Sequence, residues 1–273
     1  MADPTRIAIA GAGGRMGQAL IAAVLDATDL ALAAALDVPG SPALGADAGA
    51  TLGRATGVQV AHDVDAALAH ADVLIDFTRP DGTVAHAAAC ARHGAALVAG
   101  TTGLSPAQKD ALARHARTVP IVHSASMSVG VNVLSDLVAR AARALGGSYD
   151  IEIVEMHHRH KVDAPSGTAL GLGEAAARGA GRVLAECAVK AREGVTGPRK
   201  EGTIGFAALR GGDVVGDHTV LFAGAGERIE LAHKATSLQN FAAGALRAAH
   251  YVAARRAAGQ PGLADMRDVL GLT

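Results

Sequence analysis

The stretch Arg6-Ile7-Ala8-Ile9-Ala10-Gly11-Ala12-Gly13-Gly14-Arg15-Met16-Gly17 decides the class of fold. Its apolar beginning predicts a buried β-strand, and the residues from Gln18 to Ala27 predict a helix. Glycines between a strand and a helix let the backbone turn tightly and approach a pyrophosphate, which the free N–H groups of the helix N-terminus bind. The spacing departs from a strict G-x-G-x-x-G pattern, because position 16 is Met and the last glycine is Gly17.

A second apolar run, from Leu30 to Asp37, ends in a carboxylate. Asp37 lies about 20 residues beyond Gly17, where an acidic residue accepts hydrogen bonds from the hydroxyls of an adenosine ribose. Val38 follows and offers no cation for a 2'-phosphate, although Arg15 is a candidate for that role. These features predict a dinucleotide site that prefers NADH or uses both NADH and NADPH. The alternative is an ordinary turn with a coincidental Asp.

Strand and helix patterns alternate through the first half of the chain. Strands are expected over 58–60, 73–77, 96–99 and 121–123, and residues 38–57 form a long loop rich in Gly, Pro and Ser. Helices are expected to open at Asp63, to cover 80–93, and to open again at Ser105 with a capping box. This alternation predicts an α/β fold with a Rossmann-like, doubly wound parallel sheet.

The pattern changes after about residue 128. We expect a helix over 129–145, strands over 149–155, 203–210, 214–222 and 228–233, and a last helix from about 237 to 258. Glycine-rich segments at 211–213 and 224–226 separate the last three strands and are typical of hairpin turns. The second half is therefore predicted to be an α+β domain with a mixed or antiparallel sheet.

Composition excludes several classes of protein. The chain has 273 residues, a formal net charge of -1 and only 2% aromatic residues, which argues against nucleic acid as the main partner. It contains no apolar stretch of about 18 residues and no signal-peptide pattern, so no membrane partner is expected. Its two cysteines, Cys90 and Cys187, form neither a disulfide framework nor a metal motif. We expect a cytoplasmic protein, with Cys90 as a small core residue.

Residues 155–168 read Glu-Met-His-His-Arg-His-Lys-Val-Asp-Ala-Pro-Ser-Gly-Thr, with five basic side chains in succession. Folded chains tolerate such repulsion mainly where an anion is held, and His supplies proton donors and acceptors near neutral pH. The cluster predicts a small substrate with carboxylates and a proton-transfer step. The alternative is a solvated basic loop. No metal site is expected, because adjacent His rings do not converge easily and no other cluster completes a ligand shell.

Three motifs occur together in this chain: Gly11–Gly17, Gly100-Thr101-Thr102-Gly103 and residues 155–169. Together they resemble the dihydrodipicolinate (4-hydroxy-tetrahydrodipicolinate) reductase family of lysine and diaminopimelate synthesis, and the resemblance continues through 216–219, 233–235 and 265–270. It implies a dinucleotide-binding domain over 1–128 plus 239–273 and a substrate-binding and oligomerisation domain over 129–238. It also implies a homotetramer that reduces 4-hydroxy-tetrahydrodipicolinate to tetrahydrodipicolinate with NADH or NADPH.

The resemblance further implies roles for single residues. His157 is expected as proton donor and acceptor and Lys161 as a second donor, with substrate contacts from His158, Gly167 and Thr168. The implied cofactor-binding residues are Gly11, Ala12, Gly13, Gly14, Arg15, Met16, Asp37, Gly100, Thr101, Thr102, Ser124, Ala125, Ser126 and Met127. The family often shows Glu-Arg at positions 37 and 38, so Val38 removes the usual cation.

Several alternatives stay open at this point. A different NAD(P)-dependent reductase of an imino or oxo dicarboxylic acid would share the glycine-rich loop and Asp37. A nucleotide-sensing protein without catalysis would keep the loop but would not need His157 and Lys161. His160 is equally a hydrogen-bonded neighbour of the site or a direct contact, and Arg159 has two candidate partners, Glu155 and Asp163.

Overall fold

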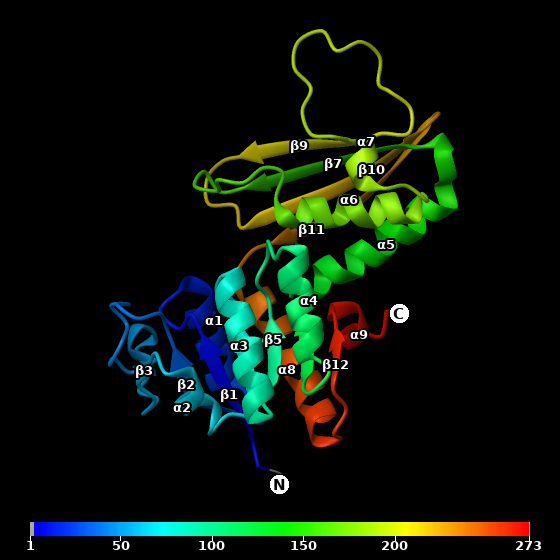
Figure 1. Ribbon diagram of the computed structural model, residues 1–273. Coiled ribbons are helices and arrows are strands. Elements are labelled where there is room, and N and C mark those ends of the chain that lie inside the picture. The colour runs from blue at the N-terminus through cyan, green and yellow to red at the C-terminus, as the bar shows by residue number, and fades with distance from the viewer. Residues whose placement is uncertain (1–2, 273) are drawn as a thin grey trace. The chain divides into compact units, whose positions relative to one another are not determined.

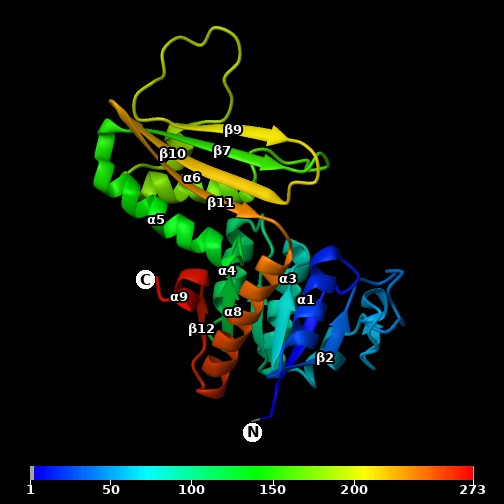
Figure 2. The ribbon, with the colours of Figure 1, turned by 180° about the vertical axis from the view of Figure 1, so that it is seen from behind.

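A computed structural model describes residues 3–272, and the chain divides into two compact units. The first unit contains residues 3–129 and 238–272, and the second contains residues 130–237. Figures 1 and 2 show the chain from opposite sides, with the segment that returns to the first unit in orange and red. The roles expected for the two parts, nucleotide binding for one and substrate binding and oligomerisation for the other, stay predictions.

The first unit is built on a seven-stranded sheet whose neighbouring strands are parallel. Across the sheet the strands are β12 (Gly262–Ala264), β6 (Pro120–His123), β5 (Ala96–Ala99), β4 (Val73–Asp76), β1 (Thr5–Ala10), β2 (Leu30–Leu36) and β3 (Val60–Ala61). Apart from β12, this is the 3-2-1-4-5-6 order of doubly wound nucleotide-binding folds. The prediction of a Rossmann-like parallel sheet is confirmed.

Helices cover both faces of this sheet (Figure 1). One face packs against α1 (Arg15–Asp26) and α8 (Gln239–Ala257), and the other against α2 (Val64–Leu68), α3 (Pro80–His93) and α4 (Pro106–His115). In β1, Ile7 and Ile9 belong to the core under α1 and α8, whereas Ala8 and Ala10 belong to the opposite core. Both faces of the strand are buried, which explains its continuous apolar run.

Local sequence signals set the ends of these helices. In α4 the Ser105 hydroxyl accepts a hydrogen bond from the Gln108 N–H at 3.3 Å, and Gln108 Oε1 accepts one from the Ser105 N–H at 2.8 Å. This is the capping box expected from the sequence. α3 begins at Pro80 and ends at His93, and Gly94, whose φ of 66° lies in the left-handed region, caps its C-terminus. Cys90 on α3 is fully buried, as expected of a core residue.

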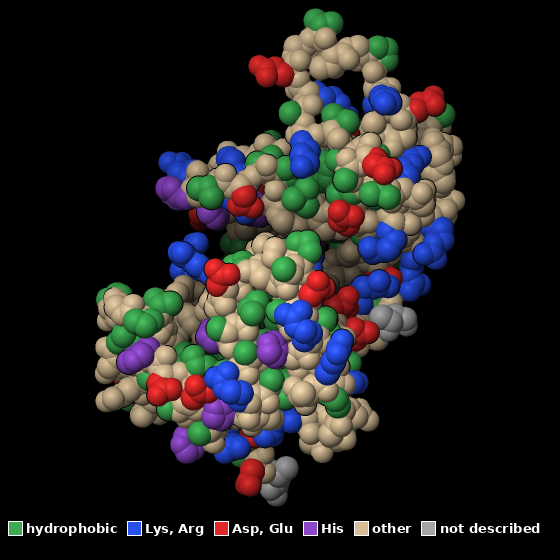
Figure 3. Space-filling view, in the orientation of Figure 1, with side chains coloured by type: hydrophobic (Ala, Val, Ile, Leu, Met, Phe, Trp, Pro, Cys, Tyr) green, Lys and Arg blue, Asp and Glu red, His purple; other side chains and the backbone are tan. Residues whose placement is uncertain are grey.

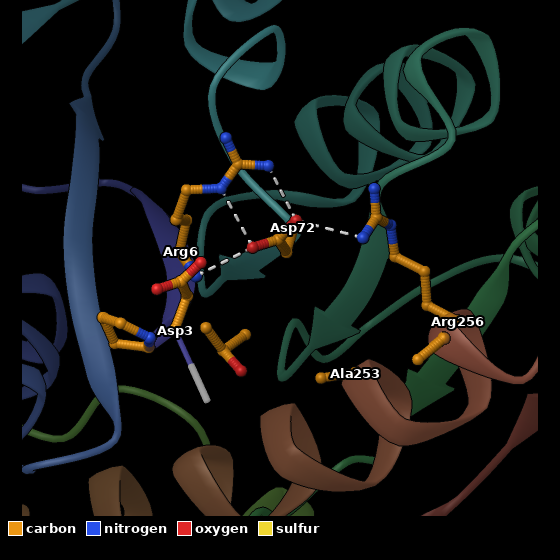
Figure 4. A pocket seen from close by; sticks show the side chains of 8 residues that line it. Asp3, Arg6, Asp72, Ala253 and Arg256 are labelled. Carbon is orange, nitrogen blue, oxygen red and sulfur yellow. Dashed lines mark hydrogen bonds and ion pairs between the residues drawn. The ribbon is translucent and has the colours of Figure 1, made fainter. Parts of the chain in front are cut away.

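An ion-pair cluster joins three elements of the first unit (Figure 4). Asp72, which precedes β4, accepts hydrogen bonds from the backbone and guanidinium of Arg6 on β1 at 2.9 to 3.1 Å. Arg256 on α8 donates to the same carboxylate at 3.0 Å. These bonds hold the pKa of Asp72 below its usual value, although partial burial acts in the opposite direction. Asp72 therefore ties α8 to the strands that this helix covers.

The second unit is a five-stranded mixed sheet with helices on one face. Across the sheet the strands are β11 (Glu227–Ala235), β10 (Gly216–Gly224), β7 (Asp150–His157), β9 (Ile204–Arg210) and β8 (Ala188–Val189). β10 is antiparallel to β7 and β11, whereas β9 is parallel to β7 and β8. The predicted α+β character and mixed sheet are confirmed.

Three helices pack on the covered face: α5 (Val129–Leu145), α6 (Gly167–Gly179) and α7 (Leu184–Cys187). Along β7 every second side chain is buried on this face. The first two, Ile151 and Ile153, belong to the apolar core. The next two are Glu155 and His157, which are 1% and 8% exposed. A row of core positions thus ends in a buried acid and a buried imidazole.

Some predicted details of the second half are wrong. Gly211-Gly212-Asp213 does not close a hairpin, because β7 lies between β9 and β10 in the sheet. The segment 224–226 does close one, with Gly224 paired to Glu227 and a φ of 83° at Gly226.

Other elements differ from the prediction in their bounds or were not predicted. β3, predicted over 58–60, is Val60–Ala61, and the loop before it contains a 3₁₀ turn, Ala50–Leu52. β8, β12, α7, α9 (Met266–Leu270) and a 3₁₀ turn, Gly146–Ser148, were not expected.

Across residues 3–272, no helix combines the length and apolar character needed to cross a membrane.

Candidate active site

The glycine-rich loop of the first unit has the geometry of an anion cradle. Gly11 has a φ of 79°, and Gly14 caps α1. A side chain at Gly17 would collide with the carbonyl of Gly11, so this glycine permits close packing of the helix on the loop. Within the described chain, the N–H groups of Arg15, Met16 and Gly17 have no hydrogen-bond acceptor. Free N–H groups at a helix N-terminus bind phosphate oxygens.

Asp37 lies beside this cradle. Its Oδ2 accepts a hydrogen bond from the Gly13 N–H at 2.9 Å, and its Oδ1 accepts one from the Val38 N–H at 2.8 Å. A Cβ at Gly13 would lie 2.6 Å from Oδ2, so only glycine leaves room for the carboxylate. The loop orients Asp37 toward a position suited to ribose hydroxyls. Val38 is 64% exposed and adds no charge there.

Two more loops leave the carboxyl edge of the same sheet, after β5 and β6. Gly100 packs against the ring of Phe77, where any side chain would collide. Thr101 is buried, its hydroxyl is bonded to Thr83 at 2.7 Å, and its carbonyl accepts a hydrogen bond from His123 Nε2 at 3.1 Å. Burial lowers the pKa of His123, which the Thr101 carbonyl partly offsets. The Gly100–Thr102 backbone is thereby held at the sheet edge, and Thr102 is exposed.

The loop after β6 contains the remaining cofactor candidates of the first unit. Ser124 donates from its hydroxyl to the carbonyl of Ser126 at 2.9 Å, and Ala125 is exposed. The Met127 side chain is buried in the core, and its carbonyl lies against Gly244 on α8. Only backbone contacts from Met127 are compatible with this burial. Ala12, likewise fully buried, offers a ligand its backbone alone.

These loops, the free N–H groups and Asp37 fit a dinucleotide. Pyrophosphate would meet the N-terminus of α1, and ribose hydroxyls would meet Asp37. The cradle leaves no space for additional side chains at Gly13 and Gly17. All these features belong to the first unit.

His157, at the end of β7, belongs to a buried polar cluster in the second unit. Its Nδ1 lies 2.5 Å from Glu155 Oε2. Arg210, at the end of β9, donates to both carboxylate oxygens of Glu155 at 2.9 Å. The strand register brings these ends together, because His157 and Arg210 are partners in the β7–β9 pairing. A bidentate arginine compensates the buried carboxylate.

Opposing effects set the charges in this cluster. Burial raises the pKa of Glu155, but hydrogen bonds from Arg210 and His157 outweigh it, and the carboxyl pKa lies below its usual value. Burial lowers the pKa of His157, which Glu155 partly offsets, and the cations Lys161 and Arg210 lower it further. Neutral His157 beside ionised Glu155 is the resulting resting state. With Nδ1–H donated to Glu155, the lone pair of His157 is on Nε2.

The N-terminus of α6 adjoins this cluster. Ser166 caps the helix, accepting the Ala169 N–H at 3.1 Å, while its own N–H donates to Glu155 Oε1 at 3.2 Å. The N–H groups of Gly167 and Thr168 have no acceptor within the described chain. The helix has 13 residues, so its N-terminus carries a substantial partial positive charge. This arrangement suits a carboxylate, as expected for Gly167 and Thr168.

The loop after His157 carries the other basic residues. Lys161 Nζ lies 2.7 Å from Asp163 Oδ1, and the rings of His158 and His160 are 6.3 Å apart. His and Lys/Arg side chains are visible where β7 and β9 end (Figure 3). Neither partner considered for Arg159 pairs with it in the described chain, because Glu155 binds Arg210 and Asp163 binds Lys161. Arg159 instead donates its backbone N–H to Gly212 at 3.2 Å.

Sequence reasoning missed four residues of this cluster: Glu155 as a partner of His157, Ser166 as the cap, Arg210 and His218. His218 on β10 lies 2.9 Å from the Ser166 hydroxyl, and its ring meets the His157 ring edge-on with centroids 5.1 Å apart. Side chains alternate between the two faces of a strand, so residues i and i+2 lie on the same face. This rule would have predicted that Glu155 lies beside His157. Arg210 gives no such signal, because only the pairing of β7 with β9 brings it close.

Comparisons with known proteins agree with this geometry. The family model described as dihydrodipicolinate reductase, N-terminus, matches residues 5–127, and the model of its C-terminus matches residues 130–270. The chain belongs to the dihydrodipicolinate reductase family. The 4-hydroxy-tetrahydrodipicolinate reductases of Cupriavidus metallidurans and Burkholderia ambifaria are 58% and 60% identical to it over 267 residues, or 98% of this chain and 99% of each relative.

A solved structure shares the fold of this dihydrodipicolinate reductase family member. It is a dihydrodipicolinate reductase from Paenisporosarcina sp. TG-14 with dipicolinate bound. The two match with a TM-score of 0.72 and 22% identity, over 96% of this chain and 97% of the other. The family comprises NAD(P)H-dependent oxidoreductases of lysine biosynthesis, so the predicted family, enzyme class and cofactor type are confirmed.

No group of three or more His, Cys, Asp or Glu side chains is placed to hold a metal ion within residues 3–272.

Proposed function

We propose that this chain reduces 4-hydroxy-tetrahydrodipicolinate to tetrahydrodipicolinate with NADH or NADPH, using His157 and Lys161 for proton transfer. The overall reaction consumes one reduced nicotinamide and one proton, and releases one water. The curated relatives named for this reaction match nearly the whole chain. The structural relative with bound dipicolinate supports a planar cyclic dicarboxylate as the substrate class.

The carboxylate-binding part of the proposed site is the turn before α6. The N–H groups of Gly167 and Thr168 supply donors at the positive end of a helix, and the Thr168 hydroxyl adds another. His158 and the cation of Lys161 lie in the preceding loop. Removal of water from the substrate leaves a C=N bond conjugated to a C=C bond, and both ring carboxylates stay anionic.

A nicotinamide held by the loops of the first unit would supply hydride to the far end of this conjugated system. As negative charge develops toward the ring nitrogen, Lys161 stabilises it electrostatically, and such stabilisation is often the largest catalytic contribution. His157 exchanges a proton through Nε2, since Nδ1 is bonded to Glu155. The ring takes up a solvent proton at Nε2, and because the pKa of His157 is lowered, the protonated ring passes this proton readily to the substrate, which balances the added hydride.

The proposed cofactor residues are those of the loops in the first unit, with Asp37 binding ribose hydroxyls. A carboxylate at this position repels a 2'-phosphate, and Val38 offers no compensating cation. We therefore propose a preference for NADH, or comparable use of both cofactors. The homotetramer stays a prediction that rests on the resemblance, and the cytoplasmic location stays a prediction that rests on the composition and the cysteine content of the sequence.

The observation that carries the proposal is the buried His157–Glu155 pair next to two free N–H groups of α6. It joins a proton-transfer group to an anion site, as reduction of an unsaturated dicarboxylate requires. The direct test follows oxidation of NADH and NADPH by the purified protein, with substrate generated in situ by the preceding pathway enzyme from pyruvate and aspartate semialdehyde. Turnover inhibited competitively by pyridine-2,6-dicarboxylate is expected. Cofactor binding without turnover would reject the substrate assignment.

A further inference from the structure

The two oxygens of Glu155 serve two different parts of the second unit. Oε2 is bonded to His157 Nδ1 at 2.5 Å, and Oε1 accepts the backbone N–H of Ser166 at 3.2 Å. Arg210 bridges both oxygens at 2.9 Å and also donates to the carbonyls of Leu209 and Asp163. One carboxylate thus connects the proton-transfer side chain to the cap of α6.

This cluster is unusual for the end of a core strand. Glu155 is 1% exposed and occupies the third inward position of β7, after two isoleucines. A carboxylate buried there costs several kcal/mol unless it is paired and hydrogen-bonded, and apolar residues at such positions are often equally stable. Stability alone therefore gives little reason for Glu155 in place of another isoleucine or valine.

We propose that Glu155 is the positioning residue of His157: it fixes the ring with Nδ1 protonated and Nε2 free. It also holds the ring at a fixed place relative to the N-terminus of α6, because the same carboxylate binds Ser166. The inference rests on the proposed function and assigns to Glu155 and Arg210 a part in the reaction through His157. An ionised carboxylate accepts hydrogen bonds and donates none, so it imposes the Nδ1–H form on a neutral imidazole. Arg210 keeps the carboxylate from rotating between its partners.

Gly216 on β10 supports this assignment independently. A Cβ at this position would lie 3.0 Å from His157 Nε2 and 3.3 Å from its Cδ2. A side chain there would press against the nitrogen that the Glu155 bond leaves free. The absence of one leaves Nε2 uncovered, as a proton-transferring atom requires.

Charged and titratable groups face His157 from each neighbouring segment. Glu155 lies on its own strand, Arg210 on β9, His218 on β10 and Lys161 in the loop that follows. Only Glu155 raises the pKa of His157 among these groups, and Lys161 and Arg210 lower it. Removing the carboxylate charge therefore shifts the His157 titration to lower pH.

The test compares wild type with Glu155→Gln, which keeps the shape but removes the charge. Glu152→Gln is the matched control, because Glu152 is on the same strand and pairs with Arg192 and Arg199 at 2.7 to 2.9 Å instead of His157. Turnover is measured as a function of pH, nucleotide affinity by titration, and folding by circular dichroism. The tautomer of His157 is read from nitrogen chemical shifts of histidine-labelled protein, assigned with His157→Gln.

We expect wild-type His157 to be protonated at Nδ1. In Glu155→Gln, kcat should fall on the order of 100-fold, as losing a carboxylate behind a catalytic imidazole typically costs at least this much. The pH profile of wild-type turnover should have a limb that is absent in His157→Gln, and in Glu155→Gln this limb should lie at lower pH. The nucleotide affinity of Glu155→Gln and the turnover of Glu152→Gln should stay at wild-type levels. An Nε2-protonated His157 in wild type, or an unchanged profile in folded Glu155→Gln, overturns the assignment. Absence of wild-type turnover rejects the proposed function instead, because the tautomer measurement does not depend on it.

Discussion

The Ser166 hydroxyl oxygen lies 2.9 Å from Nε2 of His218. This oxygen accepts the Ala169 N–H and keeps a second lone pair and its own proton, so it bonds the His218 ring in either tautomer of a neutral imidazole. Burial, together with the nearby His157, lowers the pKa of His218 to about 4. A neutral His218 thus supports the serine that caps α6 and that bonds to Glu155 through its backbone.

This relationship predicts an acid sensitivity of folding. In an unfolded chain His has a pKa of about 6.5, so between that pH and about 4 the unfolded state binds a proton that folded His218 does not. The stabilisation is fully present above about pH 6.5 and is lost on acidification, by up to about 1.4 kcal/mol per pH unit. Urea unfolding of wild type and His218→Gln at several pH values measures it. The variant should show the shallower pH dependence, and parallel curves would contradict the role of His218.

Cofactor choice should respond to position 38. Val38 is 64% exposed, so Val38→Arg requires no repacking and places a cation beside Asp37. A charge-assisted hydrogen bond to a 2'-phosphate contributes about 1.5–3 kcal/mol, so kcat/KM for NADPH should rise roughly 10- to 100-fold while that for NADH changes little. Initial rates with both cofactors provide the measurement. Val195→Arg, at another exposed valine, controls for the added charge. An unchanged ratio would show that a 2'-phosphate does not lie near residue 38.

The nucleotide cradle should not tolerate a methyl group at Gly17. Gly17→Ala would bring Cβ into the Gly11 carbonyl and separate α1 from the loop, at a cost of about 1–3 kcal/mol. We expect a lower melting temperature and weaker NADH binding, measured by calorimetry. Gly171→Ala is the matched control: it lies in α6 with nothing near its would-be Cβ, and should stabilise by about 0.5–1 kcal/mol. Equal effects of the two substitutions would contradict the packing argument.

The ion-pair cluster of the first unit should contribute measurably to stability. The Asp72 carboxylate accepts hydrogen bonds from three N–H groups of Arg6 and one of Arg256. Asp72→Asn removes its charge and should lower the free energy of unfolding by about 1–3 kcal/mol. Because the folded pKa of Asp72 is lowered, this stabilisation is present above its unfolded pKa of about 3.9 and disappears on acidification below it. Asp26→Asn, which breaks the exposed pair with Arg54, should change the free energy by less than about 1 kcal/mol. Chemical denaturation compares the two variants.

Much of the fold follows from local signals in the sequence. The run from Arg6 to Gly17 and the capping box at Ser105 each act through neighbouring residues, so the parallel sheet and its helices were predictable. The prediction that Gly211–Asp213 closes a hairpin was wrong, because strand pairing depends on residues distant in sequence. The glycines of this segment indicate a reversal but not the neighbour of the next strand, and β7 occupies the place between β9 and β10. Strands as short as β8 and β12 give too few residues for a periodicity.

The residues of the candidate site also fall into two groups, those that local sequence predicts and those that only strand pairing brings together. His157, Lys161 and the turn before α6 stand in one continuous motif, so the sequence indicates them together. Arg210 is distant in sequence from Glu155 and reaches it only because β9 pairs in parallel with β7. His218 likewise joins the cluster through the pairing of β10 with β7, which sets it opposite Glu155. Contacts made across a sheet depend on strand order, which single-sequence patterns do not determine.

The placement of α8 has a consequence for how the protein is made. Its alanine-rich face is buried against the first sheet, yet residues 130–237 precede it in the chain. On a ribosome the strands from β1 to β6 emerge long before the helix that covers one of their faces. That apolar face stays open to water, or to chaperones, while the whole second unit is synthesised, since domains otherwise form from the N-terminus onward. A protein truncated before Gln239 should consequently aggregate even though the loops after β1, β5 and β6 and the complete second unit are present.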